Sequence, residues 1–198
     1  MSNKICIVKP NGSNTYQSNL HSLKATEPPL WQLLLCSKYN TNSLIDAEVD
    51  NLSDSQILMR IRKGRYTKAI ILCSGNHPSA FIQQKDNMIR LDLLIDKMGV
   101  DVEPHTTLFF NPCEIDNIKW NLIDLNKYNC HNWHSFSNNC IRSPYGVLFT
   151  SISCPYSCSF CTVKSYYGNK YLERPLEYIY KDLDYFAKSG VINIKIMD

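Results

Sequence analysis

Three cysteines that lie close together in the second half of the chain, Cys154, Cys158 and Cys161, are the residues best suited to chemistry. Their spacing is Cys-x3-Cys-x2-Cys, and they directly follow an apolar run at residues 146–152. Thiolates are the usual ligands of iron–sulfur clusters, and a closed 4Fe–4S cluster takes four of them. A loop that supplies only three leaves one iron with an open position for a substrate or cofactor. The spacing therefore predicts a 4Fe–4S cluster with one iron accessible.

Zinc is the alternative that the same triplet leaves open, because a zinc site needs four ligands in tetrahedral array. Candidates for the fourth ligand lie upstream, at Cys130, His131, His134 and Cys140. Their spacing matches no familiar zinc finger, and the triplet follows an expected strand instead of lying in a small zinc ribbon. With zinc bound, the chain would be a noncatalytic metal-binding or interaction protein.

The remaining cysteines and the amino-terminal sequence indicate the cellular compartment in which we expect the protein. Cys6, Cys36 and Cys73 lie in apolar segments, where cysteine acts as a small buried hydrophobe. Residues 1–4 lead directly into an apolar strand and do not resemble a secretory signal. Nine cysteines without such a signal favour metal or redox use over disulfides, and we expect a cytoplasmic protein.

At the triplet the chain resembles the radical S-adenosylmethionine (SAM) superfamily, whose hallmark is Cys-x3-Cys-x2-Cys with an aromatic residue before the third cysteine, here Phe160. The resemblance implies that Cys154, Cys158 and Cys161 hold the cluster, that SAM chelates the fourth iron, and that Phe160 lies near the adenine. Tyr156 and Asp198 are further candidate cofactor contacts, and no catalytic residue is assigned.

The activity that this resemblance implies is reductive cleavage of SAM to methionine and a 5′-deoxyadenosyl radical, which abstracts hydrogen from a substrate. The cofactors carry the difficult chemistry, while the protein supplies ligation, orientation and shielding. The implied partners are an electron donor such as flavodoxin or ferredoxin and a small-molecule or biosynthetic-intermediate substrate.

The segment around the triplet reads as the first βαβ unit of a partial TIM barrel, in a domain at residues 144–198. The strand at 146–152 delivers the cysteine loop, a helix begins at Pro175 and ends at Gly190, and a strand follows at 191–197. A full barrel takes about 250 residues. We therefore expect an incomplete core and a chain that is inactive as an enzyme on its own: it is a fragment, a nonfunctional remnant, or one that a partner chain completes.

The first domain, residues 1–105, alternates expected strands with expected helices. The strands are at 4–9, 43–47 and 68–73, and the helices are at 29–39, 53–63 and 80–98. This alternation predicts a doubly wound parallel sheet of the flavodoxin or Rossmann type. Such sheets bind ligands beyond the carboxyl ends of their strands. The candidate ligand-binding loops are therefore at residues 10–27, 46–52 and 74–79. Ser74 and Gly75 are the candidate cofactor contacts.

This domain resembles the cobalamin-binding domain that precedes many radical SAM barrels. The resemblance lies in Pro28-Pro29-Leu30 at the start of a helix and in Ile45-Asp46-Ala47 on the second strand. The DxHxxG loop that gives a histidine to cobalt in some cobalamin proteins is missing, with Pro-Asn-Gly-Ser-Asn at residues 10–14. The resemblance therefore implies that cobalamin binds without a histidine ligand on the lower face of its cobalt. The alternative is a flavodoxin-like domain that binds no cofactor and serves only for packing or partner contact.

Residues 106–143 read as an irregular interdomain segment. Over the whole chain, 21 basic side chains oppose 18 acidic ones, for a formal net charge of +3. No run of lysine or arginine stands out, so nucleic acid is not indicated. No apolar stretch reaches the length of a membrane span.

Overall fold

The computed structural model describes residues 4–12, 25–73, 78–105, 109–131, 139, 141–161 and 163–197. The chain forms two compact units. The first comprises Met1–Ser22 and Trp31–Thr106, and the second comprises Leu23–Leu30 and Thr107–Asp198. The short segment before the first helix thus belongs to the same unit as the cysteine triplet.

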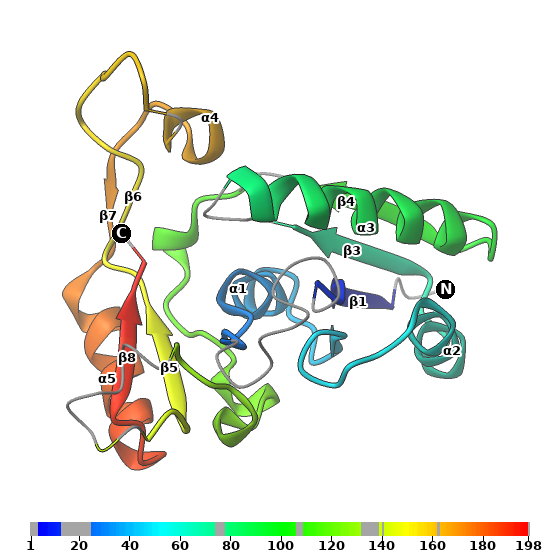
Figure 1. Ribbon diagram of the computed structural model, residues 1–198, viewed down its shortest axis with the longest axis horizontal. Helices are drawn as coiled ribbons and strands as arrows, with labels where there is room; N and C mark the ends of the chain where they lie inside the picture. The colour runs from blue at the N-terminus through cyan, green and yellow to red at the C-terminus, as the bar shows by residue number, and fades with distance from the viewer. Residues whose placement is uncertain are drawn as a thin grey trace. The chain divides into compact units, whose positions relative to one another are not determined.

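The first unit contains a four-stranded parallel sheet (Figure 1). Its elements are, in chain order, β1 (Ile5–Lys9), α1 (Leu30–Lys38), β2 (Leu44–Asp46), α2 (Asp54–Gly64), β3 (Lys68–Leu72), α3 (Pro78–Asp96) and β4 (Asp101–His105). The strand order is β2-β1-β3-β4, and every neighbouring pair is parallel. The predicted α/β class with a parallel sheet is confirmed, and this order is compatible with a doubly wound fold.

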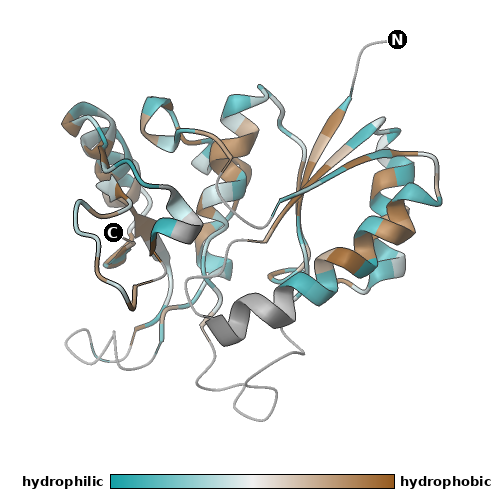
Figure 2. Cartoon of the chain, turned by 90° about the horizontal axis from the view of Figure 1, so that it is seen from above, coloured by the Kyte–Doolittle hydropathy of each residue, from teal (hydrophilic) through white to brown (hydrophobic). Residues whose placement is uncertain are grey.

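Alternate positions along the strands bury side chains on the two faces of this sheet. One face packs with α2 and α3 in a cluster that includes Val8, Ile71 and Ile61. The intervening strand residues are buried too, and there the Nε2 of Gln32 in α1 donates a hydrogen bond of 2.8 Å to the carbonyl of Leu72. Figure 2 shows the hydrophobic colouring of the strands and of the helices that cover them.

Helix α2 begins as its sequence predicts. Ser53 is the N-cap, its side chain accepts from the backbone N–H of Gln56, and the Gln56 side chain accepts from the N–H of Ser53. This capping box satisfies two backbone donors that the helix itself leaves open. At the other end Arg65 takes a left-handed conformation with φ of 54° and closes the helix.

Strand β4, at the edge of the sheet, has no counterpart in the sequence interpretation. It contains Pro104, and its charged residues Asp101 and Glu103 alternate with other residues. Such a sequence is more typical of a loop than of a strand. The Nζ of Lys68 on β3 pairs with Glu103 at 2.5 Å, and Glu103 also bonds His105 at 2.7 Å. Hydrogen bonding to Lys68 lowers the pKa of the Glu103 carboxyl. Ion pairs thus add to the backbone pairing and the partly buried Val102 that hold the outer strand.

The second unit contains a βαβ crossover. Its elements are three 3₁₀ turns, η1 (Pro112–Glu114), η2 (Trp120–Leu122) and η3 (Leu125–Lys127), then β5 (Tyr145–Leu148), β6 (Ser151–Ile152), α4 (Val163–Tyr167), β7 (Leu172–Glu173), α5 (Leu176–Lys188) and β8 (Asn193–Ile196). Strands β5 and β8 are parallel neighbours, and α5 connects them. The predicted strand at 146–152 is in fact two strands, because Phe149 and Thr150 interrupt it and β6 pairs antiparallel with β7.

Helix α5 packs on this pair of strands through Ile179 and Phe186, which are buried. A Cβ on Gly146 of β5 would lie 3.2 Å from the Phe186 ring, so the glycine permits this close approach. The helix ends in a Schellman motif: the N–H of Val191 donates to the carbonyl of Phe186, and Gly190 has φ of 71°. The predicted stop at Gly190 is confirmed.

None of the helices in the described ranges is long and apolar enough to cross a membrane.

Candidate functional site

The cysteine triplet lies on a loop at residues 153–171, between β6 and β7 (Figure 1). The two short strands pair Ser151 with Glu173 and Ile152 with Leu172. One residue further down, the N–H of Arg174 donates to the carbonyl of Thr150 at 2.8 Å. The loop therefore has a closed base, and its two ends leave the βαβ unit side by side.

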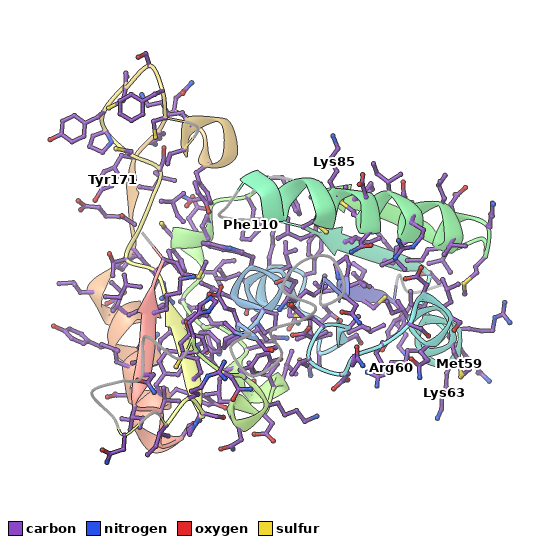
Figure 3. All side chains as sticks on the ribbon, in the orientation of Figure 1. Met59, Arg60, Lys63, Lys85, Phe110 and Tyr171 are labelled. Atoms are coloured by element: carbon purple, nitrogen blue, oxygen red, sulfur yellow. The ribbon has the colours of Figure 1, made fainter. Side chains whose placement is uncertain are left out.

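Hydrogen bonds inside the loop continue this closure. Ser153, with φ of 70°, donates through its hydroxyl to the carbonyl of Gly168 at 2.6 Å, and Gly168 has φ of 83°. The Nζ of Lys164 in α4 donates to the hydroxyl of Ser157 at 2.7 Å. Tyr171, 40% exposed, directly precedes β7 on the returning side of the loop (Figure 3).

The tip of the loop is open to solvent. Cys154 is partly buried, whereas Cys158 and Cys161 are exposed. The N–H of Cys161 donates to the carbonyl of Cys158 at 3.2 Å, which places the two residues at the ends of one turn. Tyr156 and Phe160 are 73% and 87% exposed, so neither aromatic ring is used in packing the chain itself.

The predicted ligands share a loop, but they are not gathered into a metal site. Among the described residues, no group of three or more histidine, cysteine or acidic side chains is arranged to hold a metal ion. Three soft thiol donors within eight residues of sequence fit an iron–sulfur cluster by donor chemistry. Metal uptake by this loop would therefore require the tip to close around the metal.

Of the upstream zinc candidates, Cys130 is fully buried. Its backbone N–H donates to the carbonyl of Arg142, and its own carbonyl accepts from the Nε of Arg142 at 2.7 Å. These bonds fix Cys130 in the interior. His134 and Cys140 lie outside the described residues, as do the cofactor-contact candidates Ser74, Gly75 and Asp198.

Three cysteines outside the loop are buried, and burial makes their thiols less acidic than usual. Burial raises the pKa of Cys6 and of Cys73 to about 12, and that of Cys113 to about 11. At neutral pH these groups are protonated thiols, and the thiolate is the form that binds metals and reacts. The interpretation of Cys6, Cys36 and Cys73 as small buried hydrophobes agrees with their burial.

Beneath the loop lies a buried ion pair that the sequence interpretation did not identify. The guanidinium of Arg174, just after β7, pairs with the carboxylate of Asp182 on α5 at 2.5 Å, and both side chains are almost completely buried. The Nε1 of Trp120 in η2 donates to the same carboxylate at 2.8 Å. The guanidinium also lies 4.7 Å from the centre of the Phe149 ring, a cation–π distance.

This network joins the base of the loop, the crossover helix and the segment before β5, because Arg174 and Trp120 both bond the carboxylate of Asp182. The signal in the sequence was an Arg-Pro pair at 174–175 and a lone aspartate on the apolar face of the expected helix. Neither reveals its partner, because the pairing is tertiary.

The carboxyl edge of the parallel sheet is the second candidate region. The Nζ of Lys9, at the end of β1, lies 3.0 Å from Glu48 and 3.7 Å from Asp46, at the end of β2. Asn11 donates to the carbonyl of Leu52 at 3.1 Å, which ties the loop after β1 to the loop after β2. The described charges at this edge pair with one another, and much of the remaining edge falls on residues 13–24, 74–77 and 106–108, outside the described residues.

No family model, curated protein or solved structure matches this chain.

Proposed function

We propose that this chain is an iron–sulfur protein of the radical SAM type, with Cys154, Cys158 and Cys161 as the cluster ligands. The observation that carries the proposal is the position of the three thiols on one solvent-open loop, between β6 and β7, in the connection from the first strand of a βαβ unit to its helix. In parallel βα architectures, loops at the carboxyl ends of the strands carry the functional groups.

Each part of the loop then has a role. The base, closed by β6 and β7, holds both ends of the loop, while the tip would have to close to bring three thiolates onto one cluster. When bound, the cluster and SAM supply one-electron reductive cleavage of a sulfonium. Tyr156 and Phe160 offer two exposed aromatic faces that can pack on the adenine of SAM and exclude water from the reacting groups.

Anaerobic reconstitution with iron and sulfide tests the proposal. We expect about four iron and four sulfide per chain, because three thiolates on one loop favour a 4Fe–4S cluster with one open iron. Addition of SAM to the reduced protein should change the electron paramagnetic resonance spectrum of the cluster. Stoichiometric zinc without iron, after both metals are offered, would instead support the noncatalytic zinc protein.

Single-residue variants locate the ligands. Changing Cys154, Cys158 or Cys161 to alanine should abolish the cluster. Ser159→Ala is the matched control, because it alters an exposed side chain between two of the ligands and leaves all three thiols in place. A cluster that survives in any of the three cysteine variants would place the ligands elsewhere.

For the first unit, we propose cobalamin as the ligand of the carboxyl edge of the sheet. The parallel order β2-β1-β3-β4 supports it, since sheets of this kind bind ligands at that edge. His105, at the end of β4, bonds Glu103 through its Nε2 at 2.7 Å and so helps to hold the edge strand. The proposal therefore assigns no histidine ligand to the cobalt.

A further inference from the structure

Cys158 and Cys161 are the two ends of one tight turn. The hydrogen bond of 3.2 Å from the N–H of Cys161 to the carbonyl of Cys158 closes this turn, and neither Ser159 nor Phe160 between them has positive φ. These features describe a type I turn, whose end Cα atoms lie within about 7 Å of one another. Disulfides span Cα separations of about 4.4–6.8 Å, so the backbone already brings the two cysteines close to the required distance.

Exposure singles out the same two cysteines. Among the described cysteines, Cys158 and Cys161 are the exposed ones. Cys154 is partly buried and precedes the turn, separated from it by Pro155 and two further residues. A small oxidant in solution therefore meets Cys158 and Cys161 before the other described thiols.

We propose that Cys158 and Cys161 form a reversible disulfide with a low-molecular-weight disulfide, such as glutathione disulfide, as the oxidant. One thiol of the pair loses its proton and attacks glutathione disulfide, which gives a mixed disulfide and releases one glutathione thiolate. The second cysteine then attacks the sulfur of the first and displaces the second glutathione thiolate. The two cysteines are oxidised and one glutathione disulfide is reduced to two glutathione molecules, with the two cysteine protons passing to them.

The disulfide also sets the metal capacity of the loop, a consequence that rests on the proposed function. Oxidation removes two of the three thiolate ligands and leaves Cys154 alone, and one thiolate cannot hold a cluster. Reduction restores the set. The oxidation state of this turn thus decides whether a cluster can assemble, and we call this control the redox gate.

The test uses the metal-free full chain, equilibrated anaerobically with mixtures of glutathione and glutathione disulfide, quenched in acid, alkylated and analysed by peptide mass spectrometry. We expect the two residues Cys158 and Cys161 to lose alkylation together, joined to each other, while Cys154 stays alkylated. Cys154→Ala should leave this disulfide unchanged. A predominant disulfide that includes Cys154, or separate glutathione adducts on the two cysteines without an internal disulfide, would overturn the proposal.

Two variants test the turn itself. Phe160→Pro places proline at the third position of a type I turn, where it is disfavoured, and should reduce the fraction of internal disulfide at every glutathione ratio. Ser159→Ala, at the neighbouring exposed position, should leave that fraction unchanged. Equal disulfide fractions in both variants would mean that the turn does not direct the pairing.

The gate is tested by offering iron and sulfide to the oxidised and the reduced chain in parallel. We expect the oxidised chain to take up no cluster until a dithiol reductant is added, and the reduced chain to take it up directly. Equal uptake by both would overturn the gate. Uptake by neither would overturn the gate together with the proposed function, whereas the peptide analysis would still decide on the disulfide.

Discussion

The cysteines of this chain differ in reactivity because they differ in solvent exposure. Cys6 and Cys73 are buried in the parallel sheet, where burial raises their pKa to about 12 and keeps them protonated. Cys158 and Cys161 stand in solvent, where metals and small oxidants can reach them. The apolar sequence around Cys6 and Cys73 predicted their burial.

The Arg174–Asp182 pair shows what sequence could not predict at the scale of single residues. Burial raises the pKa of the Asp182 carboxyl, while Arg174 and Trp120 act in the opposite direction. The pair holds the base of the cysteine loop to the crossover helix, so it positions the loop from below. A buried charge is tolerated only with its partner, and the partner is visible only in the fold.

Replacing Arg174 by methionine should lower the free energy of unfolding by about 3–5 kcal/mol, because the Asp182 carboxylate would remain buried without its cation. Urea denaturation of the full chain measures this loss. Lys170→Met, which removes an exposed cation from the loop, is the matched control and should have little effect. A double variant, Arg174→Met with Asp182→Leu, should recover much of the stability, since an apolar pair leaves no buried charge.

The pH dependence of the Arg174→Met variant follows from the same carboxyl. Without the guanidinium, nothing on Arg174 opposes the burial that raises the pKa of Asp182. As pH rises above the ordinary carboxyl range, the unfolded chain ionises this group more readily than the folded one, and folding stability falls. The stability difference from the parent chain should therefore increase between about pH 4 and pH 7. A constant difference over this range would mean that Asp182 does not remain buried in the variant.

At the scale of elements, apolar periodicity predicted most of the first unit. The predicted strands at 4–9, 43–47 and 68–73 correspond to β1, β2 and β3, and the three predicted helices to α1, α2 and α3. Each of these elements buries apolar side chains in the core, so each carries an apolar pattern of its own. Local sequence was sufficient because the core imposes the same pattern that the element displays.

The sequence did not predict the short strands that depend mainly on pairing with a neighbouring strand. Strand β4 is an edge strand with Pro104 and a row of charges, and β7 has only the two residues Leu172 and Glu173. The break at Phe149 and Thr150 also went unpredicted, because both residues suit a strand. What turns the chain there is the pairing of β6 with β7, a contact between segments about twenty residues apart.

The cap of α2 provides a test at this scale. Ser53→Ala removes the acceptor for the Gln56 N–H and should lower the free energy of unfolding by about 1 kcal/mol. Met59→Ala changes an exposed side chain of the same helix and keeps the capping box intact, so its effect should stay within about 0.5 kcal/mol. Urea denaturation followed by circular dichroism measures both. Equal losses in the two variants would show that the capping box does not stabilise this unit.

At the scale of the whole molecule, the chain combines a parallel sheet unit with a βαβ unit that carries the cysteine loop. Physical patterns in the sequence led to both units, whereas the functions assigned to them rest on the resemblance and on the residues themselves. The sheet order β2-β1-β3-β4 is shared by folds with many different ligands, so topology indicates where a ligand would bind and not which one.

Titration of the full chain with hydroxocobalamin tests the ligand proposed for the sheet unit. We expect binding with a base-off spectrum, because the loop after β1 lacks the DxHxxG sequence and the proposal gives the cobalt no histidine. The chain with Cys154, Cys158 and Cys161 all changed to alanine is the control, and it should bind equally well, since the parallel sheet belongs to the other unit. A spectrum that shows a protein histidine coordinated to the cobalt would contradict the assignment at the loop. Absence of binding in both chains would leave the sheet as a scaffold, because a preformed edge site for cobalamin requires no cluster in the neighbouring unit.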